Sequence, residues 1–161
     1  MDMRELTLPF KADAIVSVCD SMNYLMDKEE LEDTFVNVYN CLKNKGVFIF
    51  DMKSEYFYKS ILKDKTFAEN KENASLIWQN HYYDEDMINE YDLTIFAKKP
   101  KSSSYVKYTE TQYQRAYPLK YVLNLLKEMD FSSVMVYNAF TKKEPTIRSQ
   151  RFYFVCRKEE T

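Results

Sequence analysis

The side chain best placed for ligand chemistry is the carboxylate of Asp20, which follows Cys19 at the end of the apolar run 13–19. A short run rich in β-branched residues is typical of a strand in a parallel sheet. Open α/β sheets bind their ligands at the carboxyl ends of such strands. We therefore expect Cys19 and Asp20 to lie at a binding site, with a turn or helix cap as the alternative role for Asp20.

Aromatic residues gather between positions 78 and 117, with the cation Arg115 among them. The group consists of Trp78, Tyr82, Tyr83, Tyr113 and Tyr117. One interpretation is the wall of a substrate pocket, in which Arg115 pairs with an acidic group of the substrate. The other is the packing of a β-sheet, where aromatic residues are common and pair across strands. The lone histidine, His81, is a general base in the first interpretation and a surface residue in the second.

The composition excludes several classes of function. Gly46 is the only glycine among 161 residues, so the chain has no GxGxxG or Walker-type loop, each of which needs several glycines. The formal net charge of −2 provides no basic field for nucleic acid, and no apolar stretch approaches the length of a membrane span. One histidine and three scattered cysteines predict neither a metal site nor a disulfide framework. We expect a cytoplasmic protein that binds no nucleic acid and no membrane.

The first third of the chain predicts a single βαβ unit. A strand over 13–19, an amphipathic helix over 29–43 and a second strand over 46–51 follow one another. Gly46 is predicted to end the helix in a left-handed conformation. The two strands should be parallel, with a right-handed crossover. A short helix is expected next, over 54–62.

The rest of the chain changes pattern. Long alternating stretches predict antiparallel strands with one solvent-exposed face: 75–84, 87–99 and 105–117. A helix from Pro118 and two closing strands, 132–140 and 151–158, follow. The expected fold class is α/β, a parallel βαβ core with an antiparallel terminal strand pair and an inserted antiparallel layer. It forms one domain over 1–161, with its core at 1–62 and 118–161 and the insertion at about 70–117.

The strand over 13–19 lacks a partner on its far side. Parallel strands are buried on both faces, whereas residues 2–11 are few and polar. We therefore expect either a sheet that is completed by another chain, or a chain without the first part of its domain.

Several segments carry a family resemblance through their order and spacing: 2–6, 8–9, 13–15, 19–24, 42–51, 78–80, 114–117, 129–131 and 151–157. Together they resemble the C-terminal two-thirds of a class I S-adenosylmethionine (SAM)-dependent methyltransferase, of the small-molecule group with inserted antiparallel strands. The similarity runs over nearly the whole chain. It implies an incomplete Rossmann-like sheet and SAM as the cofactor.

The resemblance also implies a position for four cofactor-binding residues. Asp2 and Met3 would lie beside the adenine, with the Asp2 carboxylate accepting from its exocyclic amine. Cys19 and Asp20 would lie near the methionine portion of SAM. For Asp2, a solvated carboxylate near the chain end is the alternative.

On the substrate side, the resemblance places Asn23 and Tyr24 at the methyl-transfer pocket, with Tyr82, Arg115 and Tyr117 on the inserted strands and just after them. Methyl transfer from a sulfonium needs alignment and a dry pocket more than a strong acid or base. No catalytic residue is therefore assigned.

The leading hypothesis is an SAM-dependent methyltransferase that acts on a small-molecule acceptor and is incomplete in this chain. The family's Gly-rich cofactor loop precedes the matched segments by two to three βαβ units of about 30 residues each. Binding of SAM by this chain alone is therefore expected to be weak or absent. The alternative is a non-catalytic methyltransferase-like interaction module, which forms a homodimer or joins a partner chain at the exposed sheet edge.

Overall fold

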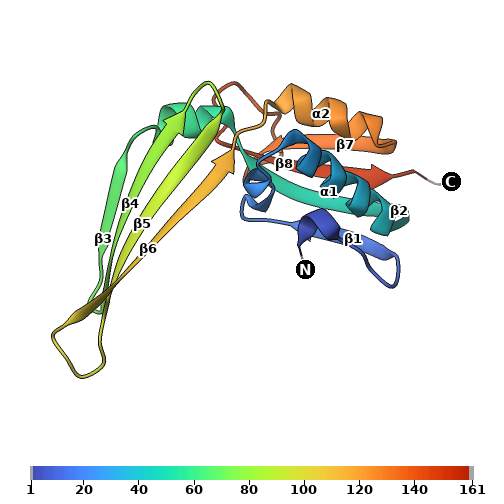
Figure 1. The fold of residues 1–161 in the computed structure, drawn as a ribbon. Helices are drawn as coiled ribbons and strands as arrows, with labels where there is room; N and C mark the ends of the chain where they lie inside the picture. The colour runs from blue at the N-terminus through green and yellow to red at the C-terminus, as the bar shows by residue number, and fades with distance from the viewer. Residues whose placement is uncertain (1, 160–161) are drawn as a thin grey trace.

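The computed structural model describes residues 2–159, which form two sheets (Figure 1). The core sheet contains, in spatial order, β1 (Ala12–Ser17), β2 (Leu42–Lys53), β8 (Arg151–Lys158) and β7 (Phe131–Asn138). The projecting sheet contains β3 (Thr66–Asn70), β4 (Ala74–Tyr83), β5 (Ile88–Lys98) and β6 (Tyr105–Arg115). Figure 1 shows the projecting sheet as a long blade that extends away from the core sheet.

The βαβ unit has the expected arrangement. β1 and β2 are parallel neighbours, with Ile15 opposite Phe48 and Ser17 opposite Phe50. Helix α1 (Lys28–Cys41) connects them. β8 runs antiparallel to both β2 and β7. The predicted α/β fold, a parallel core with an antiparallel terminal pair and an antiparallel layer, is confirmed.

The main hydrophobic core lies between the core sheet and the two helices α1 and α2 (Leu119–Glu128). Phe50 and Phe154 stack at 4.4 Å between ring centroids, and Phe35 of α1 lies 5.3 Å from Phe50. Burying each such ring stabilises the fold by about 1.5–3 kcal/mol. No helix within residues 2–159 has the length and apolar content needed to cross a membrane.

The connection between α1 and β2 differs from the prediction. The helix ends at Cys41 and β2 begins at the next residue, so Gly46 lies within the strand. The left-handed backbone belongs to Lys45, with φ 64°. A Cβ at Gly46 would lie 2.8 Å from the carbonyl oxygen of Lys43 and 3.3 Å from that of Ala12. Gly46 therefore permits the close approach of the Lys43 carbonyl within β2 and, to a lesser extent, of β1. The prediction that it ends the helix was wrong.

Within residues 2–159, the projecting sheet has a second layer only at its inner end. There Tyr58 and Leu62, from the short π-helical segment η3 (Phe57–Leu62), pack with Tyr91 and Ala116. Farther out, side chains such as Tyr108 are exposed. Strand β3 was not predicted, because all five of its residues are exposed and its sequence has no apolar alternation.

The face of the core sheet opposite the helices is uncovered in the part of the chain that the structure describes. Val16 and Val18, at the edge strand β1 and just beyond it, are 58% and 55% exposed, and Met135 of β7 is 45% exposed. Apolar surface of this kind is typical of an interaction site.

Candidate functional site

The candidate site lies at the carboxyl end of β1, where the chain turns sharply. Cys19 and Asp20 both have left-handed backbone conformations, with φ 62° and 53°. Such conformations cost about 1 kcal/mol or more for residues other than glycine, and they concentrate at functional sites. The turn brings the Asp20 backbone N–H to the Asp51 carboxylate at the end of β2, 2.8 Å from Oδ1.

The Asp20 carboxylate accepts hydrogen bonds from three other strands. Its Oδ2 lies 2.9 Å from Lys53 Nζ and 2.8 Å from Gln114 Nε2, and its Oδ1 lies 2.7 Å from Arg151 Nη2. Burial by itself would raise the pKa of this carboxyl. The hydrogen bonds from Lys53, Gln114 and Arg151 outweigh burial and hold the pKa below its usual value. Asp20 is therefore ionised at neutral pH.

Asp20, Asp51, Lys53 and Arg151 form a compact group of alternating charges, which we call the junction cluster. Arg151 joins the two carboxylates, since its Nη1 donates to Asp51 Oδ2. Burial lowers the pKa of Lys53, although Asp20 opposes this. The Lys53 ammonium also lies 5.2 Å from the centre of the Phe57 ring, a cation–π distance.

Gln114 connects the junction cluster to the projecting sheet. Its side chain is buried, and its Oε1 accepts from the hydroxyls of Tyr58 at 3.0 Å and Tyr91 at 2.8 Å. Burial raises the pKa of both tyrosines, so they remain neutral donors. Because Gln114 Nε2 donates to Asp20, one amide connects both sheets.

The structure places the predicted residue Asn23 directly behind the cluster. Asn23 is fully buried in η2 (Ser21–Tyr24); its Oδ1 accepts from Lys53 N at 2.8 Å and its Nδ2 donates to Arg115 O at 2.9 Å. Tyr24 is exposed, and its hydroxyl donates to Gln112 Oε1 at 2.8 Å. Asn23 thus braces the site, and Tyr24 lies at its surface.

The three predicted residues from the end of the insertion have different surroundings. Arg115 is engaged by backbone carbonyls, with Nη1 donating to Asp86 O at 3.0 Å and Nε donating to a carbonyl of the loop before α1. The buried Tyr117 hydroxyl lies 2.7 Å from Leu25 O. Tyr82 stacks on Tyr58, and its buried hydroxyl has no hydrogen-bond partner among the described residues. An unpartnered hydroxyl of this kind is suited to a bound ligand.

Met3 begins the N-terminal turn η1 (Met3–Glu5), and Asp2 directly precedes it. Asp2 caps this turn, with its Oδ1 3.0 Å from Arg4 N. Hydrogen bonds from Arg4 lower the pKa of Asp2 to about 2. Met3 packs against the main core, and Arg4 ties the turn to α1 through Glu30 at 2.6 Å. The junction cluster and this turn are thus held by separate contacts.

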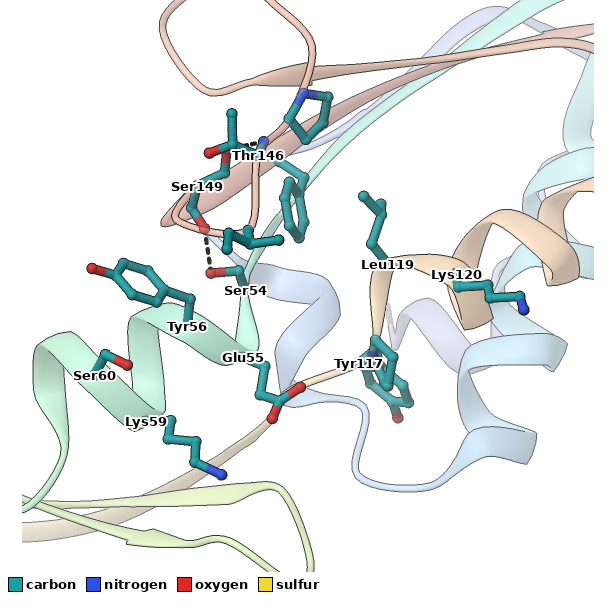
Figure 2. Close-up of a pocket in the computed structure, with 14 residues that line it drawn as sticks. Ser54, Glu55, Tyr56, Lys59, Ser60, Tyr117, Leu119, Lys120, Thr146 and Ser149 are labelled. Carbon is teal, nitrogen blue, oxygen red and sulfur yellow. Dashed lines mark hydrogen bonds between the residues drawn. The ribbon is translucent and has the colours of Figure 1, made fainter.

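One cavity opens at the junction cluster, and a larger cleft is lined by neighbouring residues such as Ser54 and Phe152. The cavity, of about 520 Å³, opens on the uncovered face of the core sheet, with Cys19, Asp20 and Asp51 in its wall. The cleft, of about 780 Å³, lies between η3, the start of α2 and the loop before β8. Figure 2 shows Glu55 and Lys59 on the η3 side of this cleft, with Tyr117 and Leu119 across from them.

Sequence relatives extend these observations, although no family model matches the chain. The chain is 34% identical over 161 residues to the protein named putative methyltransferase YqeM of Bacillus subtilis (strain 168), covering 99% of this chain and 64% of that protein. It is 31% identical over 157 residues to putative methyltransferase GWCH70_2453 of Geobacillus sp. (strain WCH70), covering 98% and 63%. The chain thus spans less than two-thirds of the length of these relatives.

Solved structures share the fold. An S-adenosylmethionine-dependent methyltransferase from Clostridium acetobutylicum ATCC 824 has a TM-score of 0.89 at 24% identity, covering 99% of this chain and 63% of that one. DesVI of Streptomyces venezuelae has a TM-score of 0.76 at 16% identity, covering 97% and 62%. CalS10 of Micromonospora echinaspora, an amino pentose methyltransferase solved with SAM bound, has a TM-score of 0.74 at 10% identity. The match covers 98% of this chain and 63% of that one.

These likenesses define the class of fold. The chain has the Rossmann-like α/β fold of the class I SAM-dependent methyltransferases, with the antiparallel layer that the sequence predicted. Two of its sequence relatives, at 34% and 31% identity, are named putative methyltransferases.

Sequence reasoning found Asp20 but did not assign its partners to the site. Asp51 carried a usable signal, because it ends a predicted parallel strand in the same way as Asp20. Lys53, Gln114 and Arg151 lie 33, 94 and 131 residues from Asp20 in sequence numbering. Their meeting depends on the register of antiparallel pairs, which the sequence pattern does not reveal.

Proposed function

We propose that this chain is part of an SAM-dependent methyltransferase that transfers a methyl group to a small-molecule acceptor. The observation that carries the proposal is the methyltransferase fold, with a TM-score of 0.89 over 99% of the chain. The junction cluster supports it, because it lies at the sheet edge where open α/β folds bind their ligands.

The residues present fit one end of SAM. Cys19 and the two carboxylates of Asp20 and Asp51 line the cavity of about 520 Å³, together with Arg151, which pairs with both carboxylates. Carboxylates suit the cationic amino and sulfonium groups of the methionine portion. We assign Cys19 and Asp20 to that portion, and Asp2 and Met3 to the adenine. When bound, SAM supplies a methyl group activated by the positive sulfur.

The nucleotide end of SAM lacks its expected partner. With Gly46 as the single glycine, these 161 residues contain no glycine-rich loop. We propose that this loop comes from outside them, on a further segment or on a partner chain. SAM should bind weakly or not at all without it.

The chain's own contribution to the reaction is alignment and exclusion of water. Asn23 holds the loop after β1 against β2 and β6, which fixes the position of Tyr24 beside the site. Tyr82, Arg115 and Tyr117 border the acceptor region in this proposal. Holding the acceptor atom about 3–3.5 Å from the methyl carbon supplies most of what such a transfer requires.

The free cysteines bear on the compartment. Cys19, Cys41 and Cys156 are all unpaired, and Cys19 is exposed. Exposed free thiols persist in reducing surroundings, so we place the protein in the cytoplasm.

Calorimetric titration with SAM tests the proposal. The 161-residue chain should show little binding, and adding the glycine-rich segment of a relative such as YqeM, as a mixed or fused chain, should restore it. In the restored protein Asp20→Asn should weaken SAM binding about tenfold or more, because a charged contact is lost. Asp13→Asn is the matched control, since Asp13 is an exposed carboxylate of β1 paired with Lys43 at 2.9 Å.

Two results would count against this proposal. Micromolar SAM binding by the chain alone would contradict the proposal that binding requires a glycine-rich loop from outside these residues. A restored protein that is folded but binds no SAM would overturn the methyltransferase assignment itself.

A second candidate function is a non-catalytic module that pairs with another chain. The uncovered apolar face of the core sheet, with Val16 and Val18 more than half exposed, favours it. Sedimentation equilibrium would then show a dimer, or a complex with a partner, that Val18→Glu dissociates. A well-folded monomer at all concentrations would exclude the homodimer.

A further inference from the structure

A third cavity, of about 310 Å³, adjoins the junction cluster and has three cationic side chains in its wall. Its walls include Lys53, Arg148 and Arg151. Lys53 and Arg151 are compensated by the carboxylates of Asp20 and Asp51. Arg148 has no acidic partner among the described residues, so the cavity carries one uncompensated positive charge.

Neutral donors line the same cavity. The side-chain amides of Asn138 and Gln150 belong to its wall, and neither has a hydrogen-bond partner within residues 2–159. A guanidinium accompanied by free amide N–H groups is the donor set that binds carboxylate or phosphate oxygens. The rings of Phe57 and Phe140 complete the wall and offer apolar contact to the rest of a ligand.

The loop that carries Arg148 is held in place on both sides. Ser54 Oγ donates to Ser149 O at 2.6 Å, and Ser54 N donates to Gln150 O at 3.0 Å. Arg148 N donates to Thr146 Oγ1 at 3.2 Å. The backbone that presents Arg148 is therefore ordered before a ligand binds, which lowers the entropic cost of binding.

We propose that this basic cavity binds an anionic group of the methyl acceptor, a carboxylate or a phosphate, with Arg148 as the residue that determines specificity. That the anion belongs to the methyl acceptor rests on the proposed methyltransferase function. Lys53 and Arg151 line this cavity and also hold Asp20. An anion anchored here therefore places the attached molecule beside the proposed position of the SAM methyl group.

The test is an NMR titration of the ¹⁵N-labelled chain without SAM, once with sodium phosphate and once with sodium acetate, at constant ionic strength. We expect saturable shifts at the side chains of Asn138, Arg148 and Gln150. Arg148→Gln should weaken the binding about tenfold or more, as expected for a lost hydrogen bond to a charged group. Arg148→Lys should give an intermediate loss, because an ammonium lacks the planar fork. The stronger of the two anions identifies the group.

Lys142→Gln is the matched control, since it removes an equal charge from the same loop outside the cavity wall. It should bind as the unmodified chain does. The proposal is overturned if neither anion shifts these side chains saturably, or if Lys142→Gln loses as much affinity as Arg148→Gln. Because SAM is absent throughout, failure here leaves the methyltransferase assignment standing, and failure of SAM binding leaves this result unaffected.

Discussion

The core sheet and the projecting sheet are stabilised in different ways. Rings packed in close contact between helices and strands hold the core sheet, as in the stack of Phe50 on Phe154. Among the residues that the structure describes, the projecting sheet has only a small hydrophobic cluster around Tyr58, and a polar network through Gln114 attaches it to the core. The candidate site lies where apolar packing gives way to charged hydrogen bonds. Substitutions in the core sheet, in the polar connection and in the outer part of the projecting sheet should therefore lower stability to different extents.

The largest effect should come from the core. Phe50→Ala removes a ring that is 1% exposed and contacts rings from α1, β2 and β8. We expect the free energy of unfolding to fall by about 3–5 kcal/mol, measured by urea denaturation. Phe140→Ala is the control, because Phe140 is 87% exposed, and it should change stability by about 0.5 kcal/mol at most. Equal losses of unfolding free energy in Phe50→Ala and Phe140→Ala would refute the view that the core around Phe50 supplies most of the stability.

The next effect should come from the polar connection. Gln114→Leu leaves the hydroxyls of Tyr58 and Tyr91 without their acceptor, and Asp20 loses a donor. Unsatisfied buried groups predict a loss of about 2–3 kcal/mol in the same denaturation assay. Gln112→Leu, two residues earlier on β6 and less buried, should cost less than about 1 kcal/mol. If both variants behave alike, Gln114 does not connect the two sheets energetically.

Acid should act on the junction cluster in a defined direction. The pKa of Asp20 is lowered in the folded chain, so its contribution is fully present above the usual carboxyl pKa of about 4 and is lost as pH falls through the lowered value. Asp20→Asn removes this contribution and should cost about 1–3 kcal/mol at pH 7. The drop in stability between pH 7 and pH 3 should then be smaller in Asp20→Asn than in the unmodified chain. An identical drop in both would show that Asp20 does not contribute to acid unfolding.

The smallest effect should come from the outer end of the projecting sheet. Tyr108 is 56% exposed, so Tyr108→Ser should change stability by about 0.5 kcal/mol or less. Hydrogen exchange sharpens the contrast: amides around Tyr108 should exchange faster than those of β2 around Phe50, because local opening there exposes little apolar surface. Equal protection at both positions would mean that the two sheets unfold as one unit.

Much of the fold was predictable from periodicity. The expected helix over 29–43 and strands over 75–84 and 105–117 match α1, β4 and β6 within a few residues. The helix α1 marks its buried face clearly, with Leu31, Phe35 and Val38 at helical spacing. β3 was missed because an exposed edge strand has no buried face to pattern its residues.

The candidate site was only partly predictable. Asp20 was found because open α/β sheets bind ligands at the ends of their strands. Asn23 was selected on the loop that follows, and Tyr117 as one of the aromatic residues near Arg115. That Asn23 is a buried brace and that backbone carbonyls engage Arg115 depend on distant contacts. Local sequence gives no signal for either.

One consequence follows from the alternation along β2. Phe50 and Met52 point into the hydrophobic core, while Asp51 and Lys53, on the opposite face, belong to the junction cluster. A one-residue misalignment during folding would press both charges against the helices and turn the phenylalanine toward water. The correct register of this single strand thus forms the hydrophobic core and the junction cluster together. A chain with β2 in the wrong register would form neither.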